Sequence, residues 1–599
     1  MRIKLKPLHI YALMIALAII TAAQAPSAAK WTPTGSSKFS TSSDTFLHGS
    51  YTKLLNGSVI GVGGGGTDEQ GRSVEIYDPK TGTWQDAAPL NFPRTGHSAL
   101  LLPNGKLFVI GGLKPRPTPP AIPAGPPEIY DPATGTWMAL SLSGENISGF
   151  YNLSPLPLHL LLPSGKVLII ARFGGVTTFY LDPNTGIVTS GPVFQPEGTV
   201  IPGFSGDTAA VLYNGKVLLL LSRRVLLLDP EAGKWTELNL PKTNGVELFG
   251  RIAALLPDGN IFAHFNTFPT QEQPKFTNYT GIFNAGALSF GNFVQQSIGD
   301  SGINEYSSVL LPQGDAVLSV EGLGATLYNT KTGQGKATDN PKGDVVSTTL
   351  LADGRVLSGE RLYGRDFESN LAPTLVTASA ASYRVEPLAP GSIATVFGPG
   401  IGGQPIYLKF ILALDDPPAP YITRKLAPFS SSSDQSNFLI PSDFPEGQVE
   451  ITIGNQRGLL SIASQAPGIF TADASGRGLP AGVLVRVKTD GTQVYEPVAR
   501  LDASTGRFLP VTIDLGPEGE QVYLVIFGTG WRRPTLTENT IVYIGGVKAS
   551  VQYTGVQGTF AGLDQMNVLI PRNLVGKGKV DVLVTVDGKT ANPVEISIK

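Results

Sequence analysis

The chain has 599 residues, of which 15% are charged, with a net charge of −2 and no cysteine. This near-neutral charge argues against electrostatic binding of nucleic acid, which needs clustered lysine and arginine. The lack of cysteine excludes disulfides, thiolate metal sites and cysteine nucleophiles. Because it contains 71 glycines and 48 prolines and has no long helical pattern, the chain is predicted to be all-β with many turns.

The N-terminal segment has the order of a secretory signal peptide. Three basic residues among the first six precede an apolar run at residues 8–20, and small residues then continue to Ala29. We therefore expect residues 1–29 to be a signal peptide, cleaved after Ala23 or Ala29. The mature protein would then be secreted, on the cell surface or in the periplasm. The alternative is an uncleaved membrane anchor, although the run is shorter than the ~20 residues that a spanning helix needs.

Two short units alternate along residues 31–365. One is an apolar strand that runs into an Asp-Pro-x-Thr-Gly turn and usually an aromatic residue. Its copies are VEIYDPKTGTW at 74–84, EIYDPATGTW at 128–137, TFYLDPNTGIV at 178–188, and weaker forms at 225–235 and 325–335. The other is a hairpin with a glycine in its tight turn, at Gly57, Gly105, Gly165, Gly215, Gly259, Gly314 and Gly354. Asn-Gly and Asp-Gly between apolar runs are strong hairpin signals.

The hairpins recur about every 50 residues, which is the period of a four-stranded propeller blade. The Gly-Gly pairs at 111–112 and 174–175, and the Tyr-to-Trp spacings at 77–84 and 130–137, resemble the kelch repeat. We expect residues 30–370 to form a kelch-like β-propeller with seven blades, or alternatively six, because one hairpin lacks its turn unit. Trp31, ahead of the first hairpin, is predicted to lie in the strand that completes the last blade. Such a strand would close the ring and remove exposed edges.

A different repeat follows residue 370. VFGPG at 396–400 is echoed by IFGTG at 526–530, and QSNFLIP at 435–441 by QMNVLIP at 565–571, both at an offset of 130 residues. The matching offsets predict two tandem immunoglobulin-like β-sandwiches, at 371–490 and 491–599. GLDQMNVLIP at 562–571 and the segment 584–598 resemble an uncharacterised C-terminal domain of secreted acidobacterial proteins. That resemblance implies export and a bacterial origin, and it implies no reaction.

A propeller followed by a sandwich is similar to galactose oxidase. That family binds copper through Tyr and His and uses a Tyr–Cys thioether radical. Cysteine is absent here, and the expected ligand pair ahead of the last hairpin falls on Asp344 and Val345. The two histidines nearest in sequence are 39 residues apart, so no local metal motif such as HExxH exists. We therefore expect no metal and no cofactor, and the sequence leans against an enzyme.

One set of polar residues could form a ligand site. The residue eight positions before each hairpin glycine is expected to open the innermost strand of its blade. Together, these residues would surround one mouth of the central channel. Polar groups that converge at such a mouth are the default binding site. The candidate ligand-binding residues are His97, Asp207, Arg251, Tyr306 and its neighbour Glu305. The alternative is that these side chains only bond channel waters and loop backbones.

The favoured function is a secreted bacterial binding or structural protein. Its propeller would present a face to a glycan, a peptide or a surface protein, and its sandwiches would act as spacer or attachment modules. The alternative is a glycan-active enzyme with a carboxylate-based site at the channel mouth. It would need two carboxylates ~5–10 Å apart, for which Asp207, Glu305 and Asp344 are candidates by position. His159 and His264 are expected to be strand-face residues.

Overall fold

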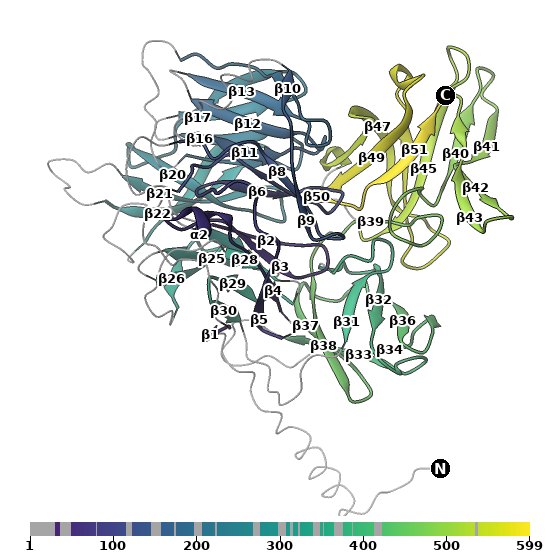
Figure 1. Ribbon diagram of the computed structural model, residues 1–599, viewed down its shortest axis with the longest axis horizontal. Coiled ribbons are helices and arrows are strands. Elements are labelled where there is room, and N and C mark those ends of the chain that lie inside the picture. Colours follow the sequence, from purple (N-terminus) through teal and green to yellow (C-terminus); the bar gives the residue numbers. More distant parts are fainter. Residues whose placement is uncertain are drawn as a thin grey trace, which may run out of the picture.

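The regular secondary structure of the computed structural model is almost entirely β-strand, which confirms the all-β prediction (Figure 1). Its described α-helix is the short α2 (Asp68–Arg72), which a capping box between Thr67 and Gln70 begins. No helix in the described part is long and apolar enough to cross a membrane. The expected signal peptide lies outside the described residues. These are 30–35, 49–79, 81–115, 122–144, 157–172, 175–196, 207–221, 224–267, 276–296, 307–311, 316–321, 324–338, 348–351, 353–364, 375–385, 387–411, 422–532 and 537–599.

The first part of the chain forms seven sheets of four antiparallel strands each, two of which carry one extra short strand. Sheet 1 contains β2 (Ser50–Lys53), β3 (Val59–Val62), β4 (Val74–Asp78) and β5 (Thr83–Asp86). Sheet 2 contains β6 (Ser98–Leu101), β7 (Leu107–Ile110), β8 (Glu128–Asp131) and β9 (Thr136–Ala139). Sheet 3 contains β10 (Ser143–Gly144), β11 (Leu158–Leu161), β12 (Val167–Arg172), β13 (Val176–Leu181) and β14 (Ile187–Ser190).

The remaining four sheets follow in chain order. Sheet 4 contains β15 (Thr208–Val211), β16 (Val217–Leu221), β17 (Arg224–Asp229) and β18 (Lys234–Leu238). Sheet 5 contains β19 (Lys242–Thr243), β20 (Val246–Leu255), β21 (Ile261–Thr267), β22 (Asn278–Asn284) and β23 (Ser289–Gln295). Sheet 6 contains β24 (Ser307–Leu310), β25 (Ala316–Glu321), β26 (Gly324–Asn329) and β27 (Gly335–Ala337). Sheet 7 contains β28 (Thr348–Leu350), β29 (Val356–Ser358), β30 (Arg361–Gly364) and β1 (Lys30–Pro33).

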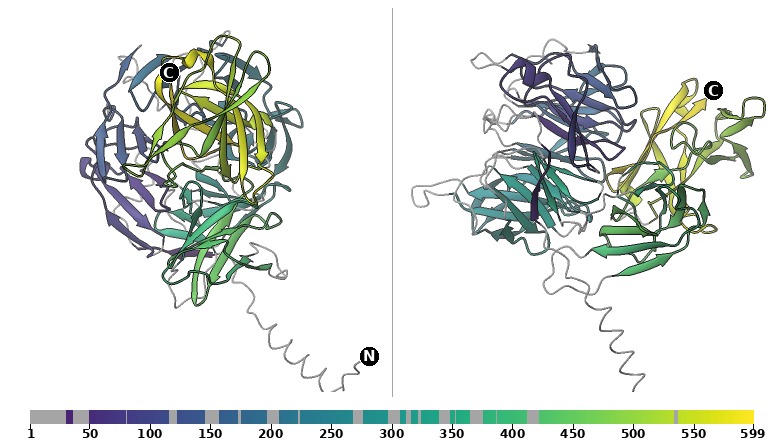
Figure 2. Two further views of the ribbon diagram at one scale, coloured as in Figure 1. Left: turned by 90° about the vertical axis from the view of Figure 1, so that its right-hand side faces the viewer. Right: turned by 60° about the horizontal axis from the view of Figure 1, so that its bottom comes forward.

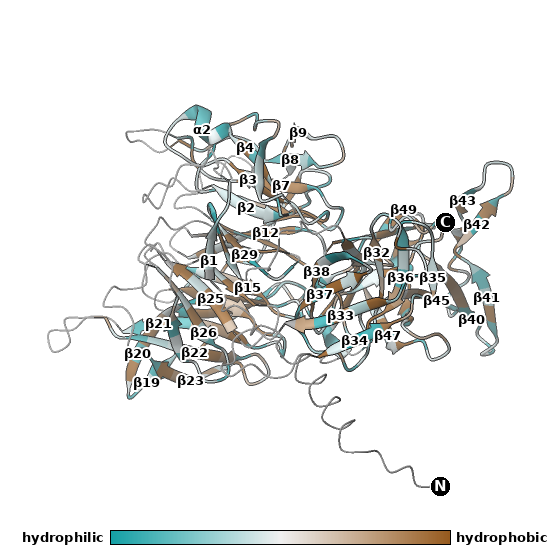
Figure 3. Ribbon diagram, turned by 90° about the horizontal axis from the view of Figure 1, so that it is seen from below, coloured by the Kyte–Doolittle hydropathy of each residue, from teal (hydrophilic) through white to brown (hydrophobic). Residues whose placement is uncertain are grey.

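The seven sheets are arranged as a closed ring. The first long strand of each sheet, called its first strand below, contacts that of the next sheet, and β28 of sheet 7 contacts β2 of sheet 1; these strands are β2, β6, β11, β15, β20, β24 and β28. Each neighbouring pair of sheets also encloses its own cluster of buried hydrophobic residues. In β16, for example, Leu218 and Leu220 pack toward sheet 5, and Leu219 packs toward sheet 3. This alternation is the two-residue period of a strand buried on both faces, and hydrophobic residues accordingly follow the strands in Figure 3.

Both repeated turns have the local structure that their residues dictate. In the first hairpin the Asn56 side chain accepts a hydrogen bond from the Ser58 N–H at 3.1 Å, and Gly57 adopts a φ of 87°. In the turn of EIYDPATGTW the Asp131 carboxylate accepts one from the Ala133 N–H at 2.9 Å. Gly135 then takes a φ of 69°, which residues other than glycine rarely adopt.

The N-terminal strand β1 closes sheet 7, as the sequence predicted. Trp31 lies opposite Tyr363 of β30, and the two ring centroids are 5.2 Å apart. The same cross-strand pair recurs as Tyr77–Trp84 in sheet 1, at 5.1 Å, and as Tyr130–Trp137 in sheet 2, at 5.0 Å. Trp31 therefore occupies the position that the aromatic residue of the repeat occupies elsewhere.

The rest of the chain forms two further units. In the first tail unit, β31 (Val376–Ser379), β32 (Ile393–Phe397), β36 (Gln435–Leu439) and β35 (Ser430–Ser431) form one sheet. A second sheet contains β34 (Thr423–Leu426), β33 (Ile406–Ile411), β37 (Gly447–Ile453) and β38 (Gln456–Ile462). A hydrophobic cluster that includes Val396, Phe438, Leu408 and Ile451 lies between the two sheets.

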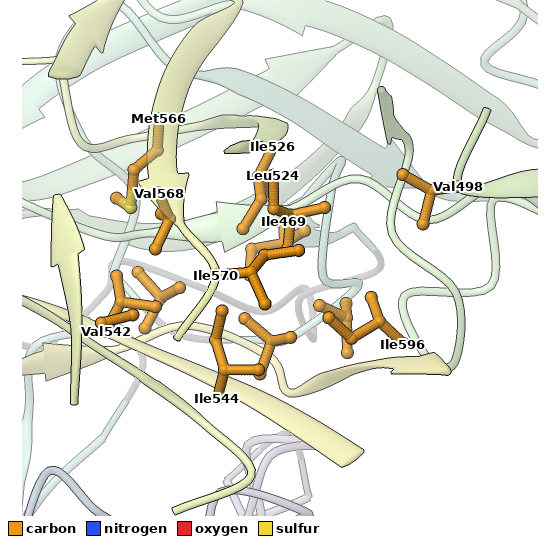
Figure 4. Packing of buried hydrophobic residues seen from close by; sticks show 14 of the residues in the cluster. Ile469, Val498, Leu524, Ile526, Val542, Ile544, Met566, Val568, Ile570 and Ile596 are labelled. Carbon is orange, nitrogen blue, oxygen red and sulfur yellow. The ribbon is translucent and has the colours of Figure 1, made fainter. Parts of the chain in front are cut away.

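The second tail unit contains one eleven-stranded sheet that folds around a single core, together with a separate two-stranded hairpin. Strand β47 connects the two halves of this sheet, because its first residues pair with β46 and the rest of it pairs with β48. Figure 4 shows the packed side chains, among them Leu524, Val542 and Met566. Its elements are β39 (Gly468–Ile469), β40 (Gly482–Val487), β41 (Gln493–Pro497), β42 (Ala499–Asp502), β43 (Arg507–Pro510), β44 (Thr512–Ile513), β45 (Gln521–Thr529), η1 (Thr537–Asn539), β46 (Thr540–Ile544), β47 (Val547–Val556), β48 (Asp564–Leu569), η2 (Arg572–Leu574), β49 (Gly578–Val586), β50 (Lys589–Thr590) and β51 (Val594–Ile598).

The 130-residue offset also appears in the hydrogen-bond register of the tail. Phe397 of β32 lies opposite Gln435 of β36, and Phe527 of β45 lies opposite Gln565 of β48. The boundary between the units is less symmetrical. Strands β39 and β40, which precede residue 490, pair with β45, which follows it.

The tail units lie side by side against one face of the ring (Figure 2). The Val385 N–H donates to the Leu55 carbonyl at 3.0 Å, and the Arg384 guanidinium donates to the Pro103 carbonyl at 2.7 Å. From the second unit, the Tyr543 hydroxyl donates to the Glu231 carboxylate. The three partners in the ring, Leu55, Pro103 and Glu231, each lie in the turn that directly follows the C-terminal end of a first or third strand. The covered face is therefore the one opposite the starts of the first strands.

Candidate functional site

The candidate site is the mouth of the ring at which the first strands begin. The Ile252 N–H of sheet 5 donates to the Thr208 hydroxyl of sheet 4 at 2.9 Å, which ties β15 to β20. Asp207 and Arg251 each directly precede one of these linked residues, and both side chains are partly buried. The hydrogen bond thus links neighbouring sheets at Thr208 and Ile252. Asp207 directly precedes β15, whereas Arg251 lies inside β20, which already begins at Val246, so Arg251 does not open its strand.

His97 is packed between sheets 1 and 2. Its Nε2 is 2.9 Å from the Ser50 hydroxyl, with which it forms a hydrogen bond. A Cβ added to Gly63 would lie 2.9 Å from His97 Cε1, and one on Gly112 would lie 3.0 Å from His97 Cβ, so both glycines leave room for this side chain. Burial, reinforced by the Arg94 charge, lowers the pKa of His97 to about 3. The imidazole is therefore neutral at physiological pH, which favours a packing role over proton transfer.

The same device recurs between other sheets. His159 Nδ1 of sheet 3 is 2.9 Å from the Ser98 hydroxyl of sheet 2, and His264 Nε2 of sheet 5 is 2.9 Å from the Ser319 hydroxyl of sheet 6. Burial lowers the pKa of each histidine to about 4. Both lie within strands, as expected. Serine–histidine pairs of this kind connect neighbouring sheets, and the burial of the imidazoles keeps them neutral.

The remaining site candidates, Glu305, Tyr306 and Asp344, lie outside the described residues. The adjacent Ser307 of sheet 6 is 2.8 Å from the Thr348 hydroxyl of sheet 7, so hydroxyl contacts between first strands continue there. Among the described candidates, Asp207 and Arg251 are on the neighbouring sheets 4 and 5, whereas His97 precedes the first strand of sheet 2 and is two sheets away from Asp207. No metal-binding group of three or more His, Cys, Asp or Glu side chains occurs within the part of the chain that the structure describes.

Sequence reasoning missed a buried ion pair near this mouth. Arg94 and Glu128 are both inaccessible to solvent, and Arg94 Nη2 is 2.9 Å from the Glu128 carboxylate. The guanidinium also donates to the Gly111 and Pro126 carbonyls, and the Asn91 N–H donates to Glu128 at 2.7 Å. The pair therefore fixes two loops to sheet 2. The signal was present, since an acidic residue opens the otherwise apolar strand in EIYD, where a buried charge requires a partner.

No protein-family model matches the chain, so the resemblance of the tail to the acidobacterial domain gains no support. An F-box/kelch-repeat protein of Arabidopsis thaliana is 49% identical over 59 residues, 10% of this chain and 15% of that protein. The influenza virus NS1A-binding protein homolog of Mus musculus is 41% identical over 61 residues, 10% of this chain and 9% of that protein. The chain thus matches only a small part of either relative. The kelch-repeat name of the Arabidopsis protein agrees with the expected repeat.

Solved structures give weaker likenesses. The extracellular domain of the putative hybrid two-component system BT4673 from B. thetaiotaomicron aligns over 73% of this chain and 59% of its own length. The sequence identity is 13% and the TM-score is 0.40. The structure of YjhT aligns over 51% of this chain and all of its own length, with 14% identity and a TM-score of 0.33.

Proposed function

We propose that the protein is a secreted bacterial binding protein in which the ring of sheets is a seven-bladed kelch-like β-propeller. The closed contacts of the first strands and the hydrophobic clusters between neighbouring sheets support the ring architecture. We further propose a signal peptide at 1–29, the propeller at 30–370 and two immunoglobulin-like sandwiches from 371. The second sandwich would begin near residue 464 rather than 491, because β39 and β40 pair with β45.

The observation that carries this proposal is the position of the tail. The two tail units cover the hairpin face of the ring through Arg384, Val385 and Tyr543. A ligand that binds the ring would then use the opposite mouth, and we propose that Asp207 and Arg251, which are on neighbouring sheets, contribute to it. The tail would act as a spacer or attachment module that holds this mouth away from the surface to which the tail is bound.

Arg251 suggests the ligand class. A planar guanidinium can form two parallel hydrogen bonds with a carboxylate, and Asp207 can accept hydrogen bonds from hydroxyl groups. An acidic sugar offers both kinds of group. A charge-assisted hydrogen bond contributes about 1.5–3 kcal/mol, so Arg251→Ala should weaken binding of such a ligand roughly 10- to 150-fold.

A glycan and peptidoglycan array with the purified protein would identify the ligand, and titration with the variants would locate the site. We expect Arg251→Ala and Asp207→Ala to lose affinity while the melting temperature stays unchanged. Lys234→Ala, a change on the outer strand of the same sheet as Asp207, is the matched control and should bind like wild type. A ligand that binds both mouth variants as tightly as wild type would place the site on the outer loops or on the sandwiches.

A further inference from the structure

One face of the second tail unit carries no charged side chain. Strands β41, β40, β45 and β48 are neighbours in its sheet, and the second half of β47 follows β48. Side chains alternate along these strands, and one set, which includes Leu484, Leu524 and Val568, packs in the core. The other set points away from the core and forms what we call the outer face. On β40, β41, β45 and β48 this outward set includes no Asp, Glu, Lys or Arg.

The ring packs against the opposite half of the same unit. A Cβ added to Gly165, in the hairpin of sheet 3, would lie 2.9 Å from Leu583 of β49, and one added to Gly588 would lie 2.8 Å from Tyr213 of the sheet 4 hairpin. Strand β46 contacts the ring through Tyr543. The outer face is therefore on the far side of the core from the ring, and β40 and β41 lie remote from the ring in Figure 1.

The most accessible side chains of the outer face are aromatic. Tyr495 of β41 is 69% exposed and Tyr553 of β47 is 40% exposed, whereas Val525 of the central strand β45 is only 5% exposed. Tyr495 and Tyr523 lie in one cross-strand row with Val485 between them, so their backbones are about 10 Å apart. The Tyr523 hydroxyl donates to Gln521 Oε1 at 2.8 Å, which holds this ring in place.

Amide side chains lie beside these tyrosines. Asn567 of β48 is opposite Tyr553 of β47 on one side and opposite Val525 on the other. Gln565 Nε2–H donates to Asn567 Oδ1 at 2.8 Å. The Asn567 amide N–H groups and the Gln565 side-chain carbonyl have no hydrogen-bond partner among the described residues, and both side chains are partly exposed. The outer face therefore presents uncharged donors and acceptors next to aromatic rings.

This chemistry indicates the class of partner. Nucleic acid and acidic membrane surfaces are bound through lysine and arginine, which the outward positions of these four strands lack. A sugar ring has a C–H face that packs on an aromatic ring, and its hydroxyl groups both donate to and accept from amides. Because the spacing of Tyr495 and Tyr523, about 10 Å, exceeds the width of one sugar ring, a ligand that contacts both must contain several sugar units.

We propose that the outer face binds an uncharged polysaccharide and thereby attaches the tail to a surface. The position of this face supports the proposal, since a polymer bound there would leave the ring exposed on the opposite side. The site is separate from the ring mouth, for which an acidic sugar is proposed, and it does not depend on Asp207 or Arg251.

Affinity gel electrophoresis of the purified protein tests the proposal. The gels contain either an uncharged polysaccharide (hydroxyethyl cellulose, xyloglucan, galactomannan or dextran) or an acidic one (polygalacturonate or alginate). At least one uncharged polysaccharide should retard the protein, and titration calorimetry with it should give an affinity that added sodium chloride leaves unchanged, because no charge is involved. No retardation by any of the uncharged polysaccharides, or an affinity that falls as salt is added, would overturn the proposal.

Two variants locate the site. Tyr495→Ala removes an exposed ring and should weaken binding about three- to tenfold, and Asn567→Ala should weaken it about fivefold, the loss expected for one neutral hydrogen bond. Tyr407→Ala is the matched control, because Tyr407 is a 37% exposed tyrosine of β33 in the first tail unit, and it should bind like wild type. Melting temperatures show whether each variant is folded. Unchanged affinity in both Tyr495→Ala and Asn567→Ala would overturn the assignment.

Two other results would assign the binding elsewhere. Arg251→Ala should bind the uncharged polysaccharide like wild type, and a loss of affinity in this variant would place the polysaccharide at the ring mouth. Sedimentation velocity should show no dimer that depends on Tyr495. A dimer that Tyr495→Ala dissociates would show that a second copy of the chain covers the outer face, and it would overturn the proposal.

Discussion

Ring closure by β1 can be tested by replacing Trp31 with alanine. The Trp31 ring packs against Tyr363 at 5.2 Å, and its Nε1–H donates to the Thr338 hydroxyl at 3.0 Å. Complete removal of a core tryptophan side chain costs about 3–5 kcal/mol. Trp31 is only partly buried, so we expect a loss of about 2–3 kcal/mol, of which the hydrogen bond contributes roughly 1 kcal/mol.

The expected change in melting temperature follows from the size of the ring. With ~2.1 cal/mol/K of unfolding entropy per residue, the ~335 residues of the ring have an unfolding entropy of about 0.7 kcal/mol/K. A loss of 2–3 kcal/mol should therefore lower the melting temperature of the ring by about 3–4 °C. Differential scanning calorimetry of the purified protein measures this change directly.

Trp137→Ala is the matched control. The ring centroids of Trp137 and Tyr130 are 5.0 Å apart, and Trp137 Nε1–H donates to the Ala88 carbonyl at 2.8 Å. Unlike β1, the strand of Trp137 follows its pairing partner directly in the sequence. Both variants should melt at similarly lowered temperatures. If Trp31→Ala melted within about 1 °C of wild type while Trp137→Ala did not, β1 would contribute nothing to the stability of the ring.

Two further predictions concern pH. Burial lowers the pKa of His159 and His264 to about 4 and, with the Arg94 charge, that of His97 to about 3. The native state therefore disfavours protonation of these histidines. The stability present above pH ~6.5 should be lost as the pH falls toward 4, by up to about 1.4 kcal/mol per pH unit per histidine. In urea titrations His159→Gln should reduce this loss, and an unchanged acid profile would contradict the assignment. Burial raises the pKa of Asp564 to about 6, so its contribution has the opposite sign, and stability should fall as the pH rises from about 4 to about 6. Asp564→Asn should remove this fall, and a variant that retains the wild-type slope would show that another group causes it.

Much of the ring could be predicted because its signals are local. Turn residues such as Gly57 and Asp131 determine their own backbone, and a repeated Tyr-to-Trp spacing shows which strands pair. Even the β1 strand followed from one missing repeat and one unplaced tryptophan.

The parts that could not be predicted depend on contacts between distant segments. The role of His97 depends on Ser50 and Gly63 in the preceding sheet, and no pattern near His97 identifies them. The matched motifs fix only the middle of each tail unit, so the sequence does not determine where one unit ends and the next begins. Strands β39 and β40 have no counterpart in the motifs of the first unit, and their pairing with β45 is known only from the structure.

The duplicated register in the tail has a consequence for refolding. Strand β36 (QSNFL) and strand β48 (DQMNVL) have similar sequences, and each pairs with an equivalent partner, β32 or β45, in the same register. A chain that refolds all at once can therefore exchange these partners between the two units, which is a characteristic failure of tandem domains. Synthesis from the N-terminus avoids the exchange, because β32 and β36 emerge and can pair before β45 exists.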